Sequence, residues 1–389
     1  MTSQLLKEFL PNKHGMGQHK KRILLIGDMP GWAFDHIIDF VRVRLKSEYE
    51  FYYDFTVYNP RDENPTKSDS NEAVNPSVIE EHYRKNYPIH QLPILKRFTY
   101  KTHKILNEHG WISRDPEGKK RRIRSDQRYD CIVFLDFYMD LDGNFDHINS
   151  PKRVKGIYTD GFPPKGIQFS KTDVPDFLKS YYHDATVMLV GAKCISEIYQ
   201  PFSKLNIFEA NLAYDETIFS PSKHQDQRNL NTLTLGWTGN PNRSFKGFYE
   251  VILPTVEGLK EEGYAIELRT QFSGSLHSLA DFWQDIDLAL IASEADAGPS
   301  MFMEASLCGV PSISTRIGMP AFVIKDGENG KFIERNTESL RNSLLQVYND
   351  RPLIERWGRN IRTDYIQKLG TEVQVGNWRN LFNAVFNEA

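Results

Sequence analysis

The sequence predicts an α/β protein with two parallel β-sheets, each covered by helices on both faces. Short apolar runs alternate with amphipathic stretches from residue 22 to residue 318. Strands that are apolar along their whole length are typical of parallel sheets buried between helices. A polar segment without a periodic apolar face, residues 215–231, separates two series of such runs. We therefore expect two Rossmann-like domains that face each other with a cleft between them.

The first series predicts an N-terminal domain over residues 1–214, joined to the second by a linker at 215–231. Its expected strands are residues 22–27, 129–137, 153–160 and 185–191. The second series predicts a C-terminal domain over residues 232–389, whose last helices could pack back on the first domain. Its expected strands are residues 233–239, 265–270, 286–293 and 311–318.

The composition favours a soluble, cytoplasmic protein. The chain has 389 residues, of which 40 % are apolar and 25 % charged, and its net charge of -3 calls for no polyanionic partner overall. No apolar run approaches the roughly 20 residues of a membrane span, and the first residues lack the apolar core of a signal peptide. The isolated cysteines Cys131, Cys194 and Cys308 are expected to be reduced core thiols.

The stretch "DAGPSMFMEASLCGVP" in the second half has the pattern of a phosphate-binding helix terminus. It follows the expected strand 286–293, and ligands of parallel sheets bind beyond the carboxyl ends of the strands. Pro299 is a good first helical residue, and Gly309 is expected to end the helix. Free backbone N–H groups at 298–301 would then hold an anion. Glu304, one turn inside an apolar helix, either binds ligand hydroxyls or pairs with a basic residue at the surface.

A second segment, "LGWTGNPNRSFKG", combines a strand, a glycine turn at Gly239 and two cations. Arg243 and Lys246 lie at the head of the next helix. The tail "DGENG" at 326–330 and the stretch "ANLAYDETIFSP" at 210–221 complete the set of motifs.

Together these motifs resemble the retaining GT-B glycosyltransferases of the family 4, or group 1, type, over about residues 210–335. The resemblance rests on an acidic residue, seven intervening residues and a glutamate, followed by Ala and Cys-Gly-Val-Pro. It implies that Glu304 binds the nucleotide ribose. The first acid, which would contact the sugar, is Asp296 on spacing, with Glu294 as the alternative. The diphosphate cradle would comprise Gly298, Pro299, Ser300 and Met301. Arg243 and Lys246 would neutralise the charge that develops on the leaving diphosphate.

The resemblance further implies a hexosyl- or pentosyltransferase that needs no metal and no cofactor other than its nucleotide-diphosphate sugar. The glycine turn at Gly31 would face the donor phosphates or the acceptor. Asp160, at a strand end, is a candidate to position or deprotonate the acceptor hydroxyl. The DxD in "MDLDG", residues 139–143, is interpreted as a polar loop.

A basic run in the first domain suggests an anionic acceptor. Between Arg84 and Arg128 there are 13 Lys or Arg against 4 Asp or Glu. The acceptor-side candidates at its centre are Lys119, Lys120, Arg121, Arg122 and Arg124. The run is either a solvated loop or a docking surface for a membrane-associated glycan or glycolipid, or for hydroxylated bases in phage-type DNA. Docking to lipid would place the protein peripherally at the inner membrane face.

Two other functions remain open at this stage. A sugar-nucleotide 2-epimerase would share the fold and the nucleotide site but act on the sugar of its own donor. A non-catalytic nucleotide-sugar-binding protein would keep the site without turnover. The spacing of Asp296 and Glu304 and the Lys246 segment favour transfer.

Overall fold

The computed structural model describes residues 20–28, 33–56, 128–141, 145, 148, 150–158, 174–221, 231–272 and 274–387. Several predicted site residues lie outside these ranges: Gly31, Asp160 and the acceptor-side candidates Lys119, Lys120, Arg121, Arg122 and Arg124. None of the described helices is both long and apolar enough to cross a bilayer.

The first domain contains a six-stranded parallel sheet in the order β2-β1-β3-β4-β5-β6. The four strands between its edges, β1, β3, β4 and β5, lie within the predicted ranges, and their residues are mostly buried. The strands are β1 (Arg22–Gly27), β2 (Glu50–Phe55), β3 (Cys131–Phe134), β4 (Arg153–Ile157), β5 (Val187–Val190) and β6 (Ile207–Glu209). The described helices are α1 (Ala33–Leu45), the 3-10 helix η2 (Phe137–Asp140), α4 (Val174–Tyr181) and α5 (Lys193–Tyr199).

The second domain contains a five-stranded parallel sheet in the order β11-β10-β9-β7-β8. Its strands are β7 (Leu233–Thr238), β8 (Ile266–Gln271), β9 (Leu288–Ile291), β10 (Ser312–Thr315) and β11 (Gly330–Ile333). Its helices include the 3-10 helix η4 (Ser244–Lys246), the π-helix η5 (Phe248–Ile252), α6 (Leu253–Glu261), α7 (Leu276–Gln284) and α8 (Ser300–Leu307). Those that follow are α9 (Gly318–Val323), α10 (Thr337–Asn349) and α11 (Pro352–Leu369).

The strands that the sequence did not predict, β2, β6 and β11, all lie at sheet edges. An edge strand has a neighbour on one side only, so it is often short or partly polar. β6 has three residues, all partly exposed, and β2 carries Glu50 and Asp54 among its aromatic residues. Unbroken apolar runs in the sequence therefore identified the interior strands and missed the edge strands β2, β6 and β11.

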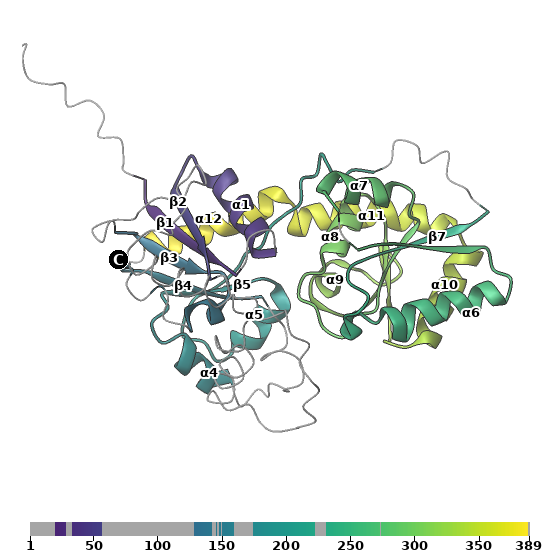
Figure 1. The fold of residues 1–389 in the computed structure, drawn as a ribbon, viewed down its shortest axis with the longest axis horizontal. Coiled ribbons are helices and arrows are strands. Elements are labelled where there is room, and N and C mark those ends of the chain that lie inside the picture. The colour runs from purple at the N-terminus through teal and green to yellow at the C-terminus, as the bar shows by residue number, and fades with distance from the viewer. Residues whose placement is uncertain are drawn as a thin grey trace, which may run out of the picture.

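The last helix, α12 (Thr371–Asn387), packs on the first domain although it follows the second domain in the chain. Figure 1 shows α11 beside the second domain and α12 behind the first sheet. The Trp378 indole N–H donates to the Asn211 carbonyl at 2.9 Å. Arg379 donates twice to the Glu48 carboxylate, at 2.9 and 2.8 Å. A second link between the domains is the Lys193 ammonium of α5, which lies 5.4 Å from the centroid of the Phe322 ring of α9.

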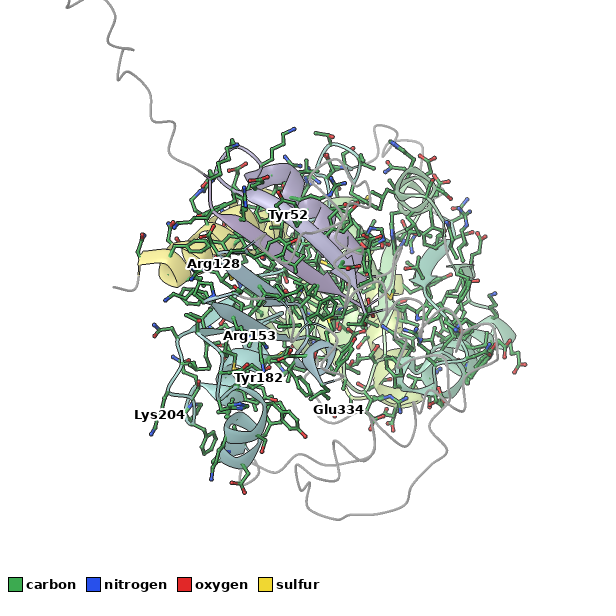
Figure 2. The ribbon with its side chains drawn as sticks, turned by 60° about the vertical axis from the view of Figure 1, so that its left-hand side comes forward. Tyr52, Arg128, Arg153, Tyr182, Lys204 and Glu334 are labelled. Carbon is green, nitrogen blue, oxygen red and sulfur yellow. The ribbon has the colours of Figure 1, made fainter. Side chains whose placement is uncertain are left out.

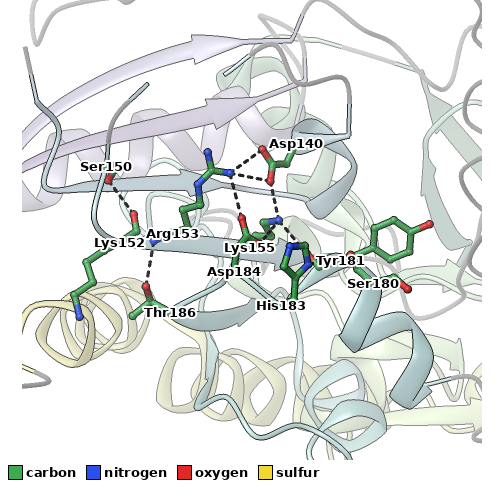
Figure 3. A network of polar contacts seen from close by, with 10 residues as sticks. All are labelled: Asp140, Ser150, Lys152, Arg153, Lys155, Ser180, Tyr181, His183, Asp184 and Thr186. Atoms are coloured by element: carbon green, nitrogen blue, oxygen red, sulfur yellow. Dashed lines mark hydrogen bonds and ion pairs between the residues drawn. The ribbon is translucent and has the colours of Figure 1, made fainter. Parts of the chain in front are cut away.

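Asp140, the first acid of the DxD motif, is not part of a simple polar loop, because it ends η2 in a nearly buried ion-pair network (Figure 3). Asp142 and Gly143 lie outside the described residues. Lys155 on β4 lies 2.7 Å from Asp140 and 2.7 Å from Asp184, and Arg153 lies 3.1 Å from Asp140. Tyr182, labelled near Arg153 in Figure 2, donates from its hydroxyl to the Gly156 carbonyl at 2.9 Å. Burial raises the pKa of the Asp140 carboxyl despite the two cations. Asp140 thus links η2 to β4 through ion pairs.

The three cysteines are free thiols in the structure. Cys131 and Cys308 are buried, and Cys194 is partly buried. Burial raises the pKa of the Cys308 thiol to about 12. This agrees with the expected role as core residues.

Candidate active site

The motif helix α8 begins beyond the carboxyl end of the buried strand β9, as the sequence predicted. The helix begins at Ser300, one residue later than expected. Pro299, expected to be the first helical residue, is instead the N-cap and has an extended backbone. Gly309 ends the helix with a φ of 70°, a conformation that glycine adopts without strain. Helix α8 therefore presents its N-terminus at the ligand-binding edge of the sheet.

Glu304 is buried inside α8, with 3 % of its surface exposed. Its Oε2 accepts a hydrogen bond from the indole N–H of Trp283, on α7, at 3.0 Å. Among the described residues this is the one side-chain hydrogen bond of the carboxylate. Burial raises the pKa of Glu304 to about 7, although the Trp283 hydrogen bond opposes this rise. The alternative of a surface ion pair for Glu304 is therefore wrong.

Lys246 and Asp296, which are 50 residues apart, form an ion pair in the structure. Both side chains are largely shielded, with 16 % and 17 % exposed. The pair forms because β7 and β9 are neighbours in the sheet, so that the loops after them meet at one edge. Asp296 also accepts the Gly298 backbone N–H at 3.2 Å through Oδ1. The N–H of Gly298, expected to be free for an anion, is therefore already bonded.

The two loops are held together by backbone contacts. Gly247 has a φ of 70°, and a Cβ at this position would lie 2.4 Å from the Ala292 carbonyl oxygen. The Glu294 backbone N–H donates to the Phe245 carbonyl at 2.8 Å. Close approach of this kind needs glycine and fixes the basic loop against the end of β9.

Arg335, which the sequence analysis did not select, connects the same two loops. Its Nε donates to the Ala292 carbonyl at 3.1 Å, and its Nη2 donates to the Ser244 carbonyl at 3.0 Å. It follows β11, 91 residues after Ser244. Nothing in its local sequence marks this role, since both acceptors are backbone atoms.

Gly318 supports the loop that carries Asp296 from the other side. A Cβ at Gly318, whose φ is 34°, would lie 2.1 Å from the Asp296 carbonyl oxygen. The next residue, Met319, donates its backbone N–H to the Ala297 carbonyl at 2.9 Å. The loop before α8 is therefore packed between α9 and the basic loop.

The remaining predicted donor residues have varied surroundings. Ser300 is exposed and lies beside the partly buried Tyr214 phenol of the 210–221 stretch, whose pKa its side chain lowers against the larger effect of burial. Met301 is buried in the core, so it could serve a ligand only through its backbone. Gly239 has a φ of 141° at the end of β7, and the Arg243 backbone N–H donates to the Asn240 carbonyl at 3.2 Å. The structure thus gathers these residues around one sheet edge.

This edge offers a cation, two carboxylates and a helix N-terminus. Lys246 can exchange its carboxylate partner for a phosphate, and Glu304 can accept hydrogen bonds from hydroxyl groups. Within the described ranges, no group of three or more His, Cys, Asp or Glu residues is arranged to hold a metal ion. The chemistry that these residues can supply is recognition of a phosphate and of a hydroxyl-bearing ligand.

Comparison with known proteins supports this interpretation. The sequence profile described as "Glycosyl transferases group 1" matches residues 254–364. The chain is 28 % identical to N-acetyl-alpha-D-glucosaminyl L-malate synthase of Bacillus anthracis over 124 residues, which is 32 % of each chain. It is 29 % identical over 103 residues to poly(ribitol-phosphate) alpha-N-acetylglucosaminyltransferase of Staphylococcus aureus (strain COL), covering 26 % of this chain and 21 % of that protein. The matches therefore span a third or less of these relatives.

The fold has a wider match than the sequence. The structure of HepE from Anabaena in complex with UDP-glucose aligns with a TM-score of 0.59 at 12 % identity, covering 93 % of this chain and 99 % of the other. The predicted fold class is confirmed: two facing Rossmann-like domains with parallel sheets, the GT-B arrangement. The segment 254–364, which matches the profile described as "Glycosyl transferases group 1", contains both α8 and β9 of the candidate site.

Proposed function

We propose that the protein is a retaining glycosyltransferase that moves a sugar from a nucleotide-diphosphate sugar to an acceptor hydroxyl. The observation that carries this proposal is the shared edge at which Glu304 of α8 and the Lys246–Asp296 pair lie beside the N-terminus of the same helix. A hydroxyl-binding carboxylate and a phosphate-binding cation at one helix terminus are the elements that a sugar nucleotide requires.

In this proposal each residue has one task toward the donor. Glu304 accepts hydrogen bonds from the ribose hydroxyls. Lys246 leaves Asp296 and stabilises the negative charge that develops on the leaving diphosphate. Asp296, released from Lys246, can then accept a hydrogen bond from a hydroxyl group of the transferred sugar. The ion pair thus keeps both residues in place before the donor binds.

The names of the relatives guide the choice of donor and stereochemistry. Both curated relatives are named for N-acetylglucosaminyl groups in alpha linkage, and the HepE structure contains UDP-glucose. Because UDP-N-acetylglucosamine carries its sugar in α linkage, an α product corresponds to retention. We propose UDP-N-acetylglucosamine and UDP-glucose as the first donors to test.

An anionic acceptor is the second part of the proposal. Malate and poly(ribitol-phosphate), which appear in the names of the relatives, are both anions. The basic run between Arg84 and Arg128, with 13 cationic against 4 acidic side chains, supplies matching charge. We infer that the acceptor is an anionic glycan, glycolipid or polyol phosphate at a membrane surface, with phage-type DNA as the alternative.

Donor binding and turnover test the proposal directly. Calorimetry without added metal should show binding of one UDP-sugar, and Glu304→Gln should weaken it. Glu338→Gln makes the same chemical change at an exposed position of α10 and should leave binding unchanged. Binding by no sugar nucleotide in the wild type would exclude a donor site.

Product analysis separates the three functions. Transfer to an anionic acceptor with an α product supports the proposal. A new sugar isomer from donor alone would instead indicate an epimerase, and binding without any turnover would indicate a binding protein. Replacing Lys119, Lys120, Arg121, Arg122 and Arg124 by Gln should reduce transfer and leave donor hydrolysis unchanged. A parallel loss of both activities would show that the basic run is structural.

A further inference from the structure

We propose that Trp283 is a positioning residue of the donor site. Its indole N–H occupies one oxygen of the Glu304 carboxylate and leaves the other oxygen as the acceptor for a donor hydroxyl. The inference rests on the proposed function, because it concerns how Glu304 meets the donor. Trp283 lies 21 residues before Glu304 and outside the motifs used in the sequence analysis.

The first support is that the indole has a fixed position. Trp283 is fully buried near the end of α7, which packs beside α8. A Cβ on Gly236, in the interior of β7, would lie 2.8 Å from Cζ3 of the Trp283 ring. Glycine in a strand interior often marks a place where another group approaches closely. Gly236 therefore provides the space that the indole fills, and the hydrogen bond at 3.0 Å to Glu304 follows from that packing.

The second support is that the ends of α7 are fixed as well. The Ser275 hydroxyl accepts the Ser278 backbone N–H at 3.2 Å and caps the start of the helix. At the other end, Gln284 donates to the Ser220 carbonyl at 3.0 Å. Since both ends are held, the indole N–H is presented to Glu304 by a rigid element.

The third support is the charge of the surroundings. The titratable groups close enough for Glu304 to raise their pKa are Tyr214, Tyr365 of α11 and Cys308 at the end of α8. Burial raises the pKa of each of these three groups, so all of them are neutral near pH 7. Among the described residues no cation offsets the burial of Glu304, and the Trp283 N–H is the group that favours its charged form. Trp283 thus orients the carboxylate and partly offsets the effect of burial on its pKa.

The test compares Trp283→Phe with Trp357→Phe as a matched control. Trp357 is a second fully buried tryptophan of the same domain, and its indole N–H donates to the Gly327 carbonyl at 2.8 Å. The probes are UDP-N-acetylglucosamine and UDP-glucose, whose diphosphate is esterified on both sides and takes up no proton between about pH 5.5 and 8.5. Their affinity is measured by calorimetry across this range.

Wild-type affinity should rise with pH around a midpoint of about 7, as Glu304 loses its proton. Removing a hydrogen bond to a charged acceptor should move this midpoint up by about one pH unit in Trp283→Phe. At pH 7 the affinity should then fall about fivefold, because the charged fraction of Glu304 falls by that factor. Trp357→Phe should keep the wild-type midpoint.

An unchanged midpoint in Trp283→Phe would overturn the inference, and so would an equal change in both variants, which would show a general effect on stability. If the wild type binds no sugar nucleotide at all, the proposed function fails, and this inference fails with it. Binding with wild-type midpoints in every variant leaves the proposed function intact and refutes only the role of Trp283.

A second measurement needs no tryptophan variant to fold. In wild-type protein labelled with ¹⁵N, one of the six indole N–H signals should titrate with the midpoint found for probe affinity. That signal should lose its pH dependence in Glu304→Gln. If no indole signal titrates in this range, Trp283 does not sense the Glu304 carboxylate and the inference is wrong.

Discussion

Burial of Glu304 should make the unliganded protein less stable as the pH rises, and Glu304→Gln should remove this dependence. The pKa of Glu304 is raised from 4.5 to about 7 in the folded protein. The folded protein therefore retains the proton in a window where the unfolded chain has lost it. The contribution of this group to stability is greatest below pH 4.5, falls as the pH rises to about 7 and is constant above that.

The expected magnitude follows from these two pKa values. At roughly 1.36 kcal/mol per pH unit, the charged carboxylate costs the folded protein about 3 kcal/mol at high pH. About 2 kcal/mol of this cost develops between about pH 5.5 and 8. Gln keeps an oxygen that can accept from Trp283 and carries no titrating proton. The difference in unfolding free energy, Glu304→Gln minus wild type, should therefore increase by about 2 kcal/mol over that interval.

Urea unfolding followed by tryptophan fluorescence at several pH values measures this difference, and the titrations of all other groups cancel between the two proteins. A difference that stays constant with pH would refute the reasoning, because it would mean that Glu304 ionises at its ordinary pKa or is charged throughout. The expected result is that the charged Glu304 lowers the unfolding free energy of the protein, a cost typical of residues that serve binding.

Three further substitutions test the geometry around the pair. Asp296→Asn should bind UDP about fivefold more tightly in calorimetry, since Lys246 no longer needs to leave a carboxylate for the phosphate, while sugar transfer falls; weaker UDP binding would contradict the exchange of partners. Arg335→Ala should clearly lower donor affinity and change the unfolding temperature only slightly, because Arg335 holds the two loops through backbone acceptors. An effect on stability alone would argue against a positioning role. Gly318→Ala should destabilise the protein by about 1–3 kcal/mol in thermal unfolding, given a Cβ that would meet the Asp296 carbonyl at 2.1 Å. Its control is Gly258→Ala in α6, where a Cβ has nothing within 4 Å and the change should stabilise slightly.

Much of the fold could be predicted because buried parallel strands are apolar along their whole length. The interior strands β1, β3, β5 and β9 each have at least four residues, and nearly all of these residues are apolar. The edge strands β2, β6 and β11 could not be predicted in this way, since an exposed edge tolerates polar and short segments.

The candidate site was predictable where its signal is local. Pro299 and Gly309 mark the start and the end of α8 in the sequence, and Glu304 stands out as a carboxylate among apolar neighbours. From those residues alone the sequence predicted a helix N-terminus at a strand end and an acid that either binds a ligand or forms a surface ion pair.

Only the tertiary structure decided what these residues touch. The partner of Glu304 is a tryptophan 21 residues away, that of Asp296 a lysine 50 residues away, and Arg335 bonds a carbonyl 91 residues away. Each contact depends on the strand order β9-β7-β8, which places the loops after β7 and β9 side by side and α7 against α8. Strand order is set by packing of the whole domain, and no local pattern of residues encodes it.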